Sequence, residues 1–276
     1  MMKPVRSLLF PLLACLFCSL SLAGQDGLFP AFDIRSRLLG GTGLSAEGID
    51  GLWTNPAGLA ASPRSIAASA AAEQRFGLSE LTMANVGASY GTGLGGFGLQ
   101  LGSFGFDAYQ ETRIGLAYGR QLTENFRVGL DFVGFATNTE AYASTFDATF
   151  GLGFQLRIIP ELSIGARVFS PFRAERFPDE YLPQLLAIGL SYQPSEKIIV
   201  NAEVHKDSTF PLRTRVGLEY LPAEELSVRF GVATENTELS FGLGYEVIDG
   251  LELSAGAVWH ELLGIYPGVG LRYRQD

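Results

Sequence analysis

Two histidines are the side chains of this chain best suited to acid–base chemistry. His205 is expected on the same face of a strand as Asn201 and Glu203, and His260 follows Trp259 near a strand end. A catalytic histidine needs a nucleophile within hydrogen-bond reach, and no serine stands at a recognisable spacing from either histidine. We expect both rings to fill a polar interior, and a lipid-modifying enzyme is kept only as an alternative.

Metal, thiol and nucleic-acid chemistry are disfavoured by composition. Both cysteines, Cys15 and Cys18, lie in an N-terminal leader, so the rest of the chain has two histidines and no thiol for a transition-metal site. Without residues 1–23 the chain has 18 basic and 29 acidic residues, a net charge of −11, which is the wrong sign for a nucleic-acid binder. No cofactor and no metal are expected.

Ionisable residues of both signs fall on one face of many segments, opposite an apolar face. In an enclosed interior such charges pair with each other, which favours a structural role over direct contact with a ligand. We expect this set to line the inside of the fold. Its members are Arg113, Arg127, Asp131, Asp147, Arg167, Glu203, His205, Arg213, Arg215, Glu219, Arg229 and Glu246.

Apolar residues recur at every second position through most of the chain, which is the period of a β-strand rather than of a helix. The pattern is clearest over residues 212–220, 226–232 and 239–247. Residues 81–106 carry no charge and are long enough for a membrane-spanning helix, but their eight glycines disfavour one by about 1 kcal/mol each relative to alanine. Two strands, 81–90 and 94–104, are expected there instead.

About 14 such segments follow one another between residues 65 and 274, and their connections alternate between short and long. Thr123-Glu124 and Asp249-Gly250 are short connections, whereas 136–145 and 171–183 are longer. An even strand number and unequal connections predict an all-β fold, a transmembrane antiparallel barrel with a short N-terminal plug. A soluble β-sandwich also alternates in this way and remains an alternative. Aromatic residues expected in a girdle near strand ends are Tyr192, Tyr220, Tyr245, Trp259 and Tyr273.

The first 23 residues have the layout of a secretory signal peptide. A basic start precedes an apolar run from Leu8 to Leu22, and Ala23 is a small residue suited to cleavage. An uncleaved membrane anchor and lipoprotein processing at Cys15 both stay open as alternatives. The expected organisation is a signal peptide (1–23), an N-terminal hatch (24–64) and a barrel (65–276).

Residues 24–64 do not alternate, and a barrel of about 14 strands leaves a lumen that needs filling. Asn55 can cap a helix with its side chain, and Pro56 needs no amide at the first helical position, so a short helix is expected to begin there. The glycine cluster at 40–43 is not a phosphate loop, because no Lys-Ser or Lys-Thr follows it. This segment is therefore expected to form the plug.

The run from Arg35 through Gly40 and Gly41 to Asn55, Pro56 and Ala57 resembles the plug opening of the FadL outer-membrane transporters, and especially their PorV and PorQ branch. The resemblance is specific over residues 31–60 and architectural beyond them. It implies a 14-stranded barrel with an N-terminal hatch. FadL-type members pass hydrophobic molecules, and PorV-type members assist type IX protein secretion. The chain departs from both in its short outer loops.

These observations predict a protein of the bacterial outer membrane that handles hydrophobic compounds or assists secretion. Its expected partners are outer-membrane lipid and either hydrophobic small molecules or secretion-system components. A purely structural barrel with a sealed lumen is the alternative from another class. Residues 171–183 combine charged and aromatic side chains and are the expected external contact surface.

Overall fold

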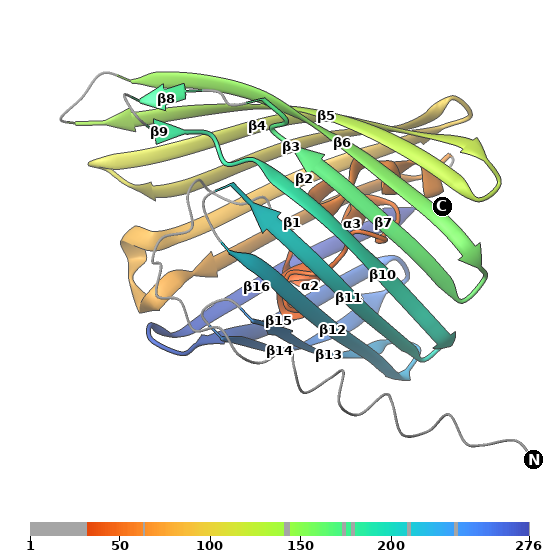
Figure 1. Ribbon diagram of the computed structural model, residues 1–276. Coiled ribbons are helices and arrows are strands. Elements are labelled where there is room, and N and C mark those ends of the chain that lie inside the picture. Colours follow the sequence, from red (N-terminus) through yellow and green to blue (C-terminus); the bar gives the residue numbers. More distant parts are fainter. Residues whose placement is uncertain are drawn as a thin grey trace, which may run out of the picture.

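Fourteen strands close into one antiparallel barrel, with a small additional hairpin in one connection (Figure 1). The first barrel strand pairs with the last, and every other barrel strand pairs with its neighbours along the chain. The expected 14-stranded barrel is therefore confirmed, and the β-sandwich alternative is wrong. The signal peptide and residues 24–31 lie outside the part of the chain that the computed structural model describes, which comprises 32–62, 64–140, 144–172, 175–177, 180–208, 211–234 and 237–275.

The barrel strands begin and end close to the boundaries of the alternating segments. They are β1 (Ile66–Gln74), β2 (Thr82–Thr92), β3 (Gly95–Phe106), β4 (Tyr109–Thr123), β5 (Phe126–Thr139), β6 (Thr145–Ile159), β7 (Leu162–Phe169), β10 (Leu185–Ser195), β11 (Ile198–Asp207), β12 (Leu212–Ala223), β13 (Leu226–Ala233), β14 (Glu238–Ile248), β15 (Leu251–His260) and β16 (Gly264–Gln275). The uncharged stretch near residue 90 forms β2 and β3, each slightly longer than expected.

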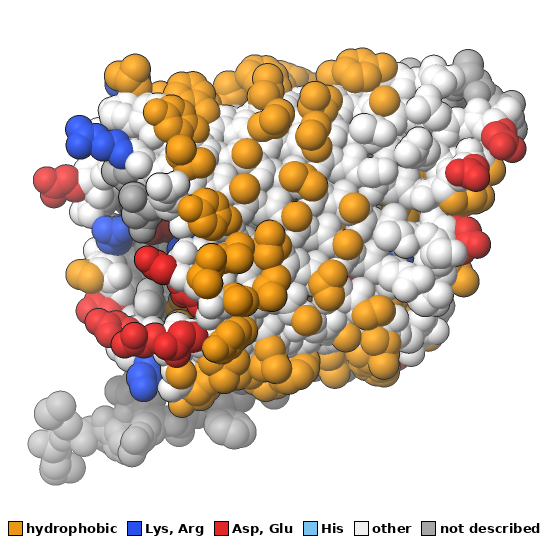
Figure 2. Space-filling view, turned by 180° about the vertical axis from the view of Figure 1, so that it is seen from behind, with side chains coloured by type: hydrophobic (Ala, Val, Ile, Leu, Met, Phe, Trp, Pro, Cys, Tyr) orange, Lys and Arg blue, Asp and Glu red, His pale blue; other side chains and the backbone are white. Residues whose placement is uncertain are grey.

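Alternation along each strand separates an apolar outer face from a polar inner face, because successive side chains point to opposite sides. On β4, Ile114 and Leu116 point outward and are exposed, whereas Arg113 and Ala117 point inward and are buried. Hydrophobic side chains cover the outer wall, and charged ones gather at its two ends (Figure 2). This is the inverse of a soluble protein.

The two ends of the barrel differ in the length of their connections. The connections after β2, β4, β6, β10, β12 and β14 contain two residues each, and all lie at the same end of the barrel. We call this end the short-turn end. At the opposite end, 170–184 is the longest connection and contains the hairpin β8 (Glu175–Phe177) and β9 (Glu180–Tyr181). The expected asymmetry is present, with two differences. Connection 107–108 is as short as the turns at the other end, and 140–144 is shorter than expected because β5 continues to Thr139.

Exposed tyrosines mark the short-turn end on the outer face. Tyr192, Tyr220, Tyr245 and Tyr273 all lie near the end of a strand that runs toward the short turns. Trp259 is exposed at the other end of β15. The aromatic residues therefore occupy both borders of the apolar wall.

The N-terminal segment, residues 32–62, lies inside the barrel (Figure 1). It contains α2 (Ile34–Leu38), α3 (Ile49–Thr54) and the 3-10 helix η3 (Pro56–Ala61). Asn55 accepts a hydrogen bond from the amide of Ala57, so the element that begins at Pro56 is a capped 3-10 helix, and the two α-helical turns before it were not expected. Two further 3-10 turns, η4 (Arg75–Gly77) and η5 (Ser79–Leu81), join β1 to β2. No helix among the described residues is long and apolar enough to cross a membrane.

Candidate functional site

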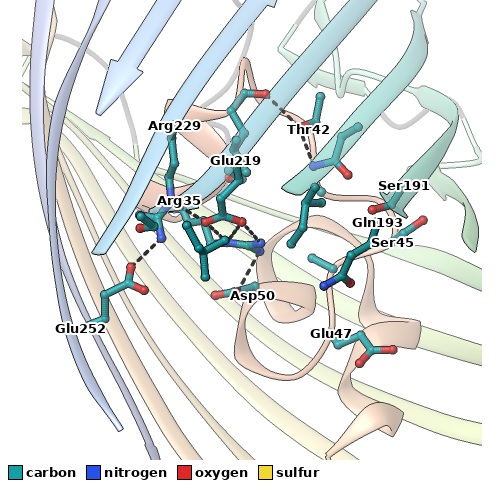
Figure 3. Close-up of a pocket in the computed structure, with 18 of the residues that line it drawn as sticks. Arg35, Thr42, Ser45, Glu47, Asp50, Ser191, Gln193, Glu219, Arg229 and Glu252 are labelled. Carbon is teal, nitrogen blue, oxygen red and sulfur yellow. Dashed lines mark hydrogen bonds and ion pairs between the residues drawn. The ribbon is translucent and has the colours of Figure 1, made fainter. Parts of the chain in front are cut away.

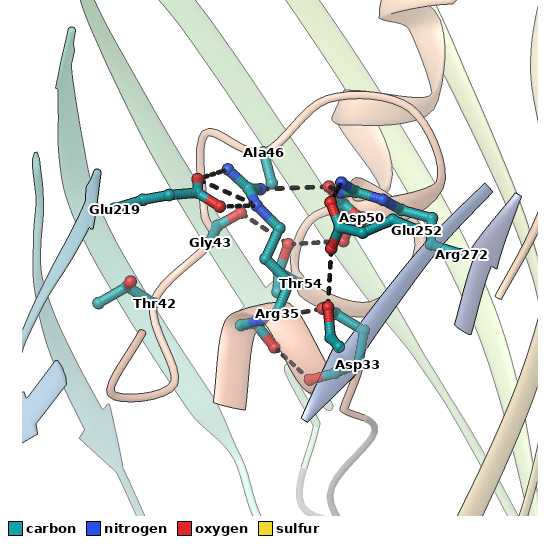
Figure 4. Close-up of polar contacts among 12 residues, drawn as sticks. Asp33, Arg35, Thr42, Gly43, Ala46, Asp50, Thr54, Glu219, Glu252 and Arg272 are labelled. Carbon is teal, nitrogen blue, oxygen red and sulfur yellow. Dashed lines mark hydrogen bonds and ion pairs between the residues drawn. The ribbon is translucent and has the colours of Figure 1, made fainter. Parts of the chain in front are cut away.

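A closed ring of ion pairs joins the N-terminal segment to the barrel wall. Basic and acidic side chains alternate around it, so its net formal charge is zero. Two members come from α2 and α3, and four come from β12, β13, β15 and β16. In order, the members are Arg35, Glu219, Arg229, Glu252, Arg272 and Asp50 (Figures 3 and 4).

Arg35 begins the ring from the first turn after Asp33, which caps α2 through a hydrogen bond to the Ser36 amide. The Nε of Arg35 donates to Glu219 over 3.1 Å, its Nη2 donates to the same carboxylate, and its Nη1 lies 3.1 Å from Asp50 Oδ2. A guanidinium that meets a carboxylate with two nitrogens fixes direction as well as distance. Arg35 therefore sets the orientation of α2 against β12.

Arg229 continues the ring along the wall and is fully buried. It donates to Glu219 of the neighbouring strand β12 over 2.7 Å. It also donates to Glu252 over 2.8 Å, although β14 lies between β13, which carries Arg229, and β15, which carries Glu252. Gly244 makes this reach possible, because a Cβ on that glycine would stand 2.8 Å from both Arg229 Nη1 and Glu252 Oε1. Arg272 pairs with Glu252 over 2.6 Å and closes the ring on Asp50.

Wall side chains also hold the irregular backbone of the N-terminal segment. Glu203 Oε1 accepts hydrogen bonds from the amides of Gly43 and Leu44, each over 2.7 Å. Its other oxygen lies 2.7 Å from His205 Nε2. By accepting hydrogen bonds from two buried backbone amides, the carboxylate takes the place of the water that these amides would otherwise bind. His205 thus stabilises a structural carboxylate.

Asn55 ties the start of η3 to two strands. Its Nδ2 donates to the carbonyl oxygens of Leu44, Phe154 and Ala166, while its Oδ1 caps η3. Arg167 lies beside it and donates over 2.8 Å to the Thr54 carbonyl and over 2.7 Å to Asp131. Glycines on the wall leave room for the start of η3, because a Cβ on Gly153 of β6 would collide with Asn55 and one on Gly129 of β5 would collide with Pro56.

The glycine pair of the N-terminal segment lies directly against the wall. Gly40 and Gly41 have positive φ angles of 71° and 75°, which favour glycine. A Cβ on Gly40 would stand 2.9 Å from the Val216 carbonyl oxygen and from the Val232 amide, so only glycine fits. On the wall, a Cβ at Gly231 would collide with Gly40 itself. Backbone therefore packs on backbone at this contact.

On the opposite side the segment packs against the wall through two apolar clusters. Phe32, Ile34 and Leu38 form a buried cluster with Ala71 of β1 and Met83 of β2. A second cluster joins Ile49, Leu52, Trp53 and Leu59 of the segment to Ala67 of β1 and Ala117 of β4. The ion-pair ring thus lies toward β12 to β16, and the two apolar clusters lie toward β1 to β4, where Arg37 also pairs with Glu73 over 2.7 Å.

A cavity of about 460 Å³ opens at the short-turn end beside the ion-pair ring (Figure 3). Its inner wall includes Asp33, Arg35 and Asp50, and its rim includes the turn residues Glu161 and Glu196. Burial, reinforced by the neighbouring Asp50 carboxylate, raises the pKa of Asp33 to about 6. Acidic side chains therefore stand both at the inner end of the cavity and at its mouth.

The interior residues expected from the sequence do not form one site. Arg35, Glu219 and Arg229 belong to the ring, and Glu203 with His205, Asp131 with Arg167, and Arg215 through the Gly41 carbonyl hold the segment at separate points. Arg127 pairs with Glu47, and Glu246 caps the Gly250 amide, both at the short-turn end. Arg113 lies over the rings of Phe135 and Phe169. Asp147 and Arg213 are half-buried near the long-loop end.

Three members of the ring were not expected from the sequence. Glu252 and Arg272 each stand between two apolar residues, so the period of two already places them on the inner face. Asp50 lies in the segment that does not alternate, where no sequence signal gives its direction. His260, the second histidine, accepts amide hydrogen bonds from Leu262 and Leu263 through Nδ1, which stabilises the turn after β15.

Comparison with known proteins finds the same fold in solved structures. No protein-family model and no curated protein sequence matches the chain. A structure titled CymD monoaromatic hydrocarbon channel aligns with a TM-score of 0.70 and 13% identity over 89% of this chain and 97% of that chain. The toluene transporter TodX of Pseudomonas putida aligns with a TM-score of 0.66 and 13% identity over 89% of this chain and 98% of that chain.

The chain shares the fold of these hydrocarbon channels. The expectation of a FadL-like barrel is thereby confirmed for the fold, while the narrower resemblance to PorV and PorQ stays a prediction. The deletion variant of TodX named as lacking S2 also aligns, with a TM-score of 0.62. At 12–13% identity, the alignments show a shared fold and do not transfer the role of any residue to this chain.

Proposed function

We propose that the protein is a channel of the bacterial outer membrane for small hydrophobic molecules, closed in the observed state by residues 32–62. The observation that carries this proposal is the 14-stranded barrel enclosing an N-terminal segment, a fold shared with two hydrocarbon channels. The leader at residues 1–23 supports export, and we retain residues 24–64 as the hatch.

The outer wall supports a membrane location. Its exposed residues are apolar between two borders of aromatic side chains, and charged residues stand at the ends. An apolar band flanked by aromatic girdles is typical of outer-membrane barrels, whose short turns face the periplasm. We therefore place the short-turn end in the periplasm.

The two-sided interface suggests where a hydrophobic molecule would pass. The charged side of the hatch is fastened by the ring, and separating those buried charges costs free energy. The apolar side, where Ile34 and Leu38 of α2 pack against Ala71 of β1, is held mainly by apolar contacts. One ion pair, between Arg37 and Glu73, also crosses it. We propose that hydrophobic molecules pass on this side when the hatch shifts.

A reversible disulfide tests whether the hatch controls passage. A Cβ placed on Gly270 lies 2.8 Å from the Cβ of Ile34, so a shift of about 1 Å brings an Ile34→Cys/Gly270→Cys pair to disulfide geometry. The only native cysteines lie in the leader. In cells with a lipopolysaccharide outer membrane, uptake of radiolabelled toluene is expected to be low under oxidising conditions and to recover on reduction.

Each single-cysteine variant is the control and should be insensitive to reduction. If cells with the native chain take up no more toluene than cells without the protein, the channel proposal is contradicted. Uptake that is the same in the oxidised and reduced double variant would contradict the hatch as a gate.

A second candidate is an accessory role in type IX secretion. It rests on the resemblance of residues 35–57 to the PorV and PorQ plug. Affinity purification from the native cell envelope tests it: recovery of secretion components together with unchanged toluene uptake would favour this candidate over the channel.

A further inference from the structure

The cavity at the short-turn end holds more acidic groups than its arginines neutralise. Ten carboxylates and five guanidinium groups line it, which gives a net formal charge of −5. Three acids and three arginines form the neutral ring, so seven carboxylates remain against Arg157 and Arg274. Arg157 and Arg127 both pair with Glu47, so the acidic excess belongs to the other carboxylates of the cavity.

The unneutralised carboxylates are spread along the cavity. Glu161, Glu196, Glu224 and Glu225 stand on three turns at the rim and are exposed, whereas Asp33 lies at the inner end on the start of α2. No group of three or more potential metal ligands gathers within the described part of the chain. This spacing suits several separated positive charges better than one compact metal ion.

Asp33 gives an independent indication of a ligand. Asp33 is only 5% exposed, and its Oδ1 accepts a hydrogen bond from the Ser36 amide. Its Oδ2 has no hydrogen-bond partner among the described residues. Ser45 Oγ, which lines the same cavity, also has none there. A buried carboxylate oxygen without a donor is costly. A cationic donor in the cavity would lower that cost.

We propose that this cavity binds a linear organic polycation of the polyamine class, with one terminal ammonium group directed toward Asp33 and the others paired with the carboxylates of the rim. A volume of about 460 Å³ falls within the range of small-molecule sites. An acidic recess between low-dielectric walls concentrates cations from solution. The inference does not depend on hydrophobic transport, because the site is formed in the closed state.

Calorimetric titration of spermidine into the full chain in a neutral detergent, at low ionic strength, tests the proposal. The rim variant carries Glu161→Gln, Glu196→Gln, Glu224→Gln and Glu225→Gln. The matched control carries Glu80→Gln, Asp107→Asn, Glu140→Gln and Glu261→Gln, four exposed acids on connections at the long-loop end. Saturable binding is expected, weakened about tenfold or more in the rim variant and less than about twofold in the control.

Asp33→Asn tests the inner end of the site, because asparagine keeps the oxygen that caps α2. We expect weaker binding of spermidine, by about threefold, with the rim intact. Heat-dependent electrophoretic mobility verifies that each variant has formed the barrel.

Several results would overturn the proposal. These are absence of saturable binding, equal weakening by the rim and control variants, and unchanged affinity of Asp33→Asn. Magnesium ion binding as tightly as spermidine would show a site for a small divalent ion instead. Tighter binding of a trilysine peptide than of spermidine would assign the cavity to a basic segment of a protein.

Discussion

Arg35 and Glu219 lie 184 positions apart in the chain, and the guanidinium of one meets the carboxylate of the other through both Nε and Nη2. Glu219 also accepts from Arg229, so a single carboxylate joins the N-terminal segment to two neighbouring strands. The pair is buried, and its position is fixed at both ends by regular structure. It therefore fastens the segment to the wall at one defined place.

Removal of this carboxylate should loosen the segment without opening the barrel. Glu219→Leu leaves Arg35 and Arg229 without their shared partner, and loss of one member of a buried pair costs about 3–5 kcal/mol. Fluorescence of Trp53 in a Trp259→Phe background reports the segment alone, because the chain has only two tryptophans. The urea midpoint of the Trp53 signal should fall well below that of the parent.

The double variant Arg35→Met/Glu219→Leu is the control for this pairing. It should lose less stability than the sum of the two single changes, because each single change already removes the contact. Additive losses would show that the two side chains do not act as a pair.

A methyl group at the backbone contact should displace the segment. Gly231→Ala places a Cβ against Gly40, whereas Gly93→Ala places one where no atom lies within 4 Å. We expect trypsin to cleave at Arg35 and Arg37 in the first variant and to leave them intact in the second. Mass spectrometry of the digest measures this, and equal protection in both variants would contradict the close approach.

A charge in the middle of the outer wall should impair insertion into lipid. Leu116 lies near the middle of β4 and is 62% exposed, and Leu122 lies near its end and is 54% exposed. In a bilayer, arginine costs about 2–4 kcal/mol at mid-depth and about 0–1 kcal/mol near the interface. Leu116→Arg should therefore fold into liposomes less completely than Leu122→Arg, as measured by heat-dependent mobility. Equal folding would argue against a lipid-facing wall.

The attachment of the segment should weaken as pH rises from about 4 to 6. The pKa of Asp33 is raised from 3.8 to about 6 by burial and by Asp50, so the folded state holds its proton more tightly than the released segment does. The stabilising contribution is complete below pH 3.8 and is lost as pH passes 6. Urea titrations of Trp53 fluorescence across this range should show the fall, and Asp33→Asn should reduce it. A native chain with no pH dependence would contradict the shift.

The barrel could be predicted from the sequence because its pattern is local. Each strand alternates on its own, and several of the two-residue connections carry turn residues, as Asp249-Gly250 does. Strand number and the asymmetry of the ends therefore follow from the chain read in order. Strand ends were less certain. β5 continues to Thr139 because Ala136 and Thr137 still pair with β4 and β6, which alternation alone does not reveal.

The interior contacts could be predicted only in part. Arg229 and Glu219 were expected to face inward, but their connection to Arg35 spans most of the chain and depends on how α2 is turned. Asp50 illustrates the limit, since it lies on a helix of six residues with no periodicity to give its direction. Gly244 was recognisable as an inner glycine, yet the space that it leaves for Arg229 appears only when β13, β14 and β15 are aligned.

The strand that closes the barrel, β16, also covers part of the N-terminal segment. The seam between β1 and β16 needs the last residues of the chain, and Ile34 of the first helix contacts Gly268 and Gly270 on that final strand. One strand therefore completes both the wall and the enclosure of the N-terminal segment. A truncation that removes β16 would therefore leave the wall open and would also uncover one side of the N-terminal segment.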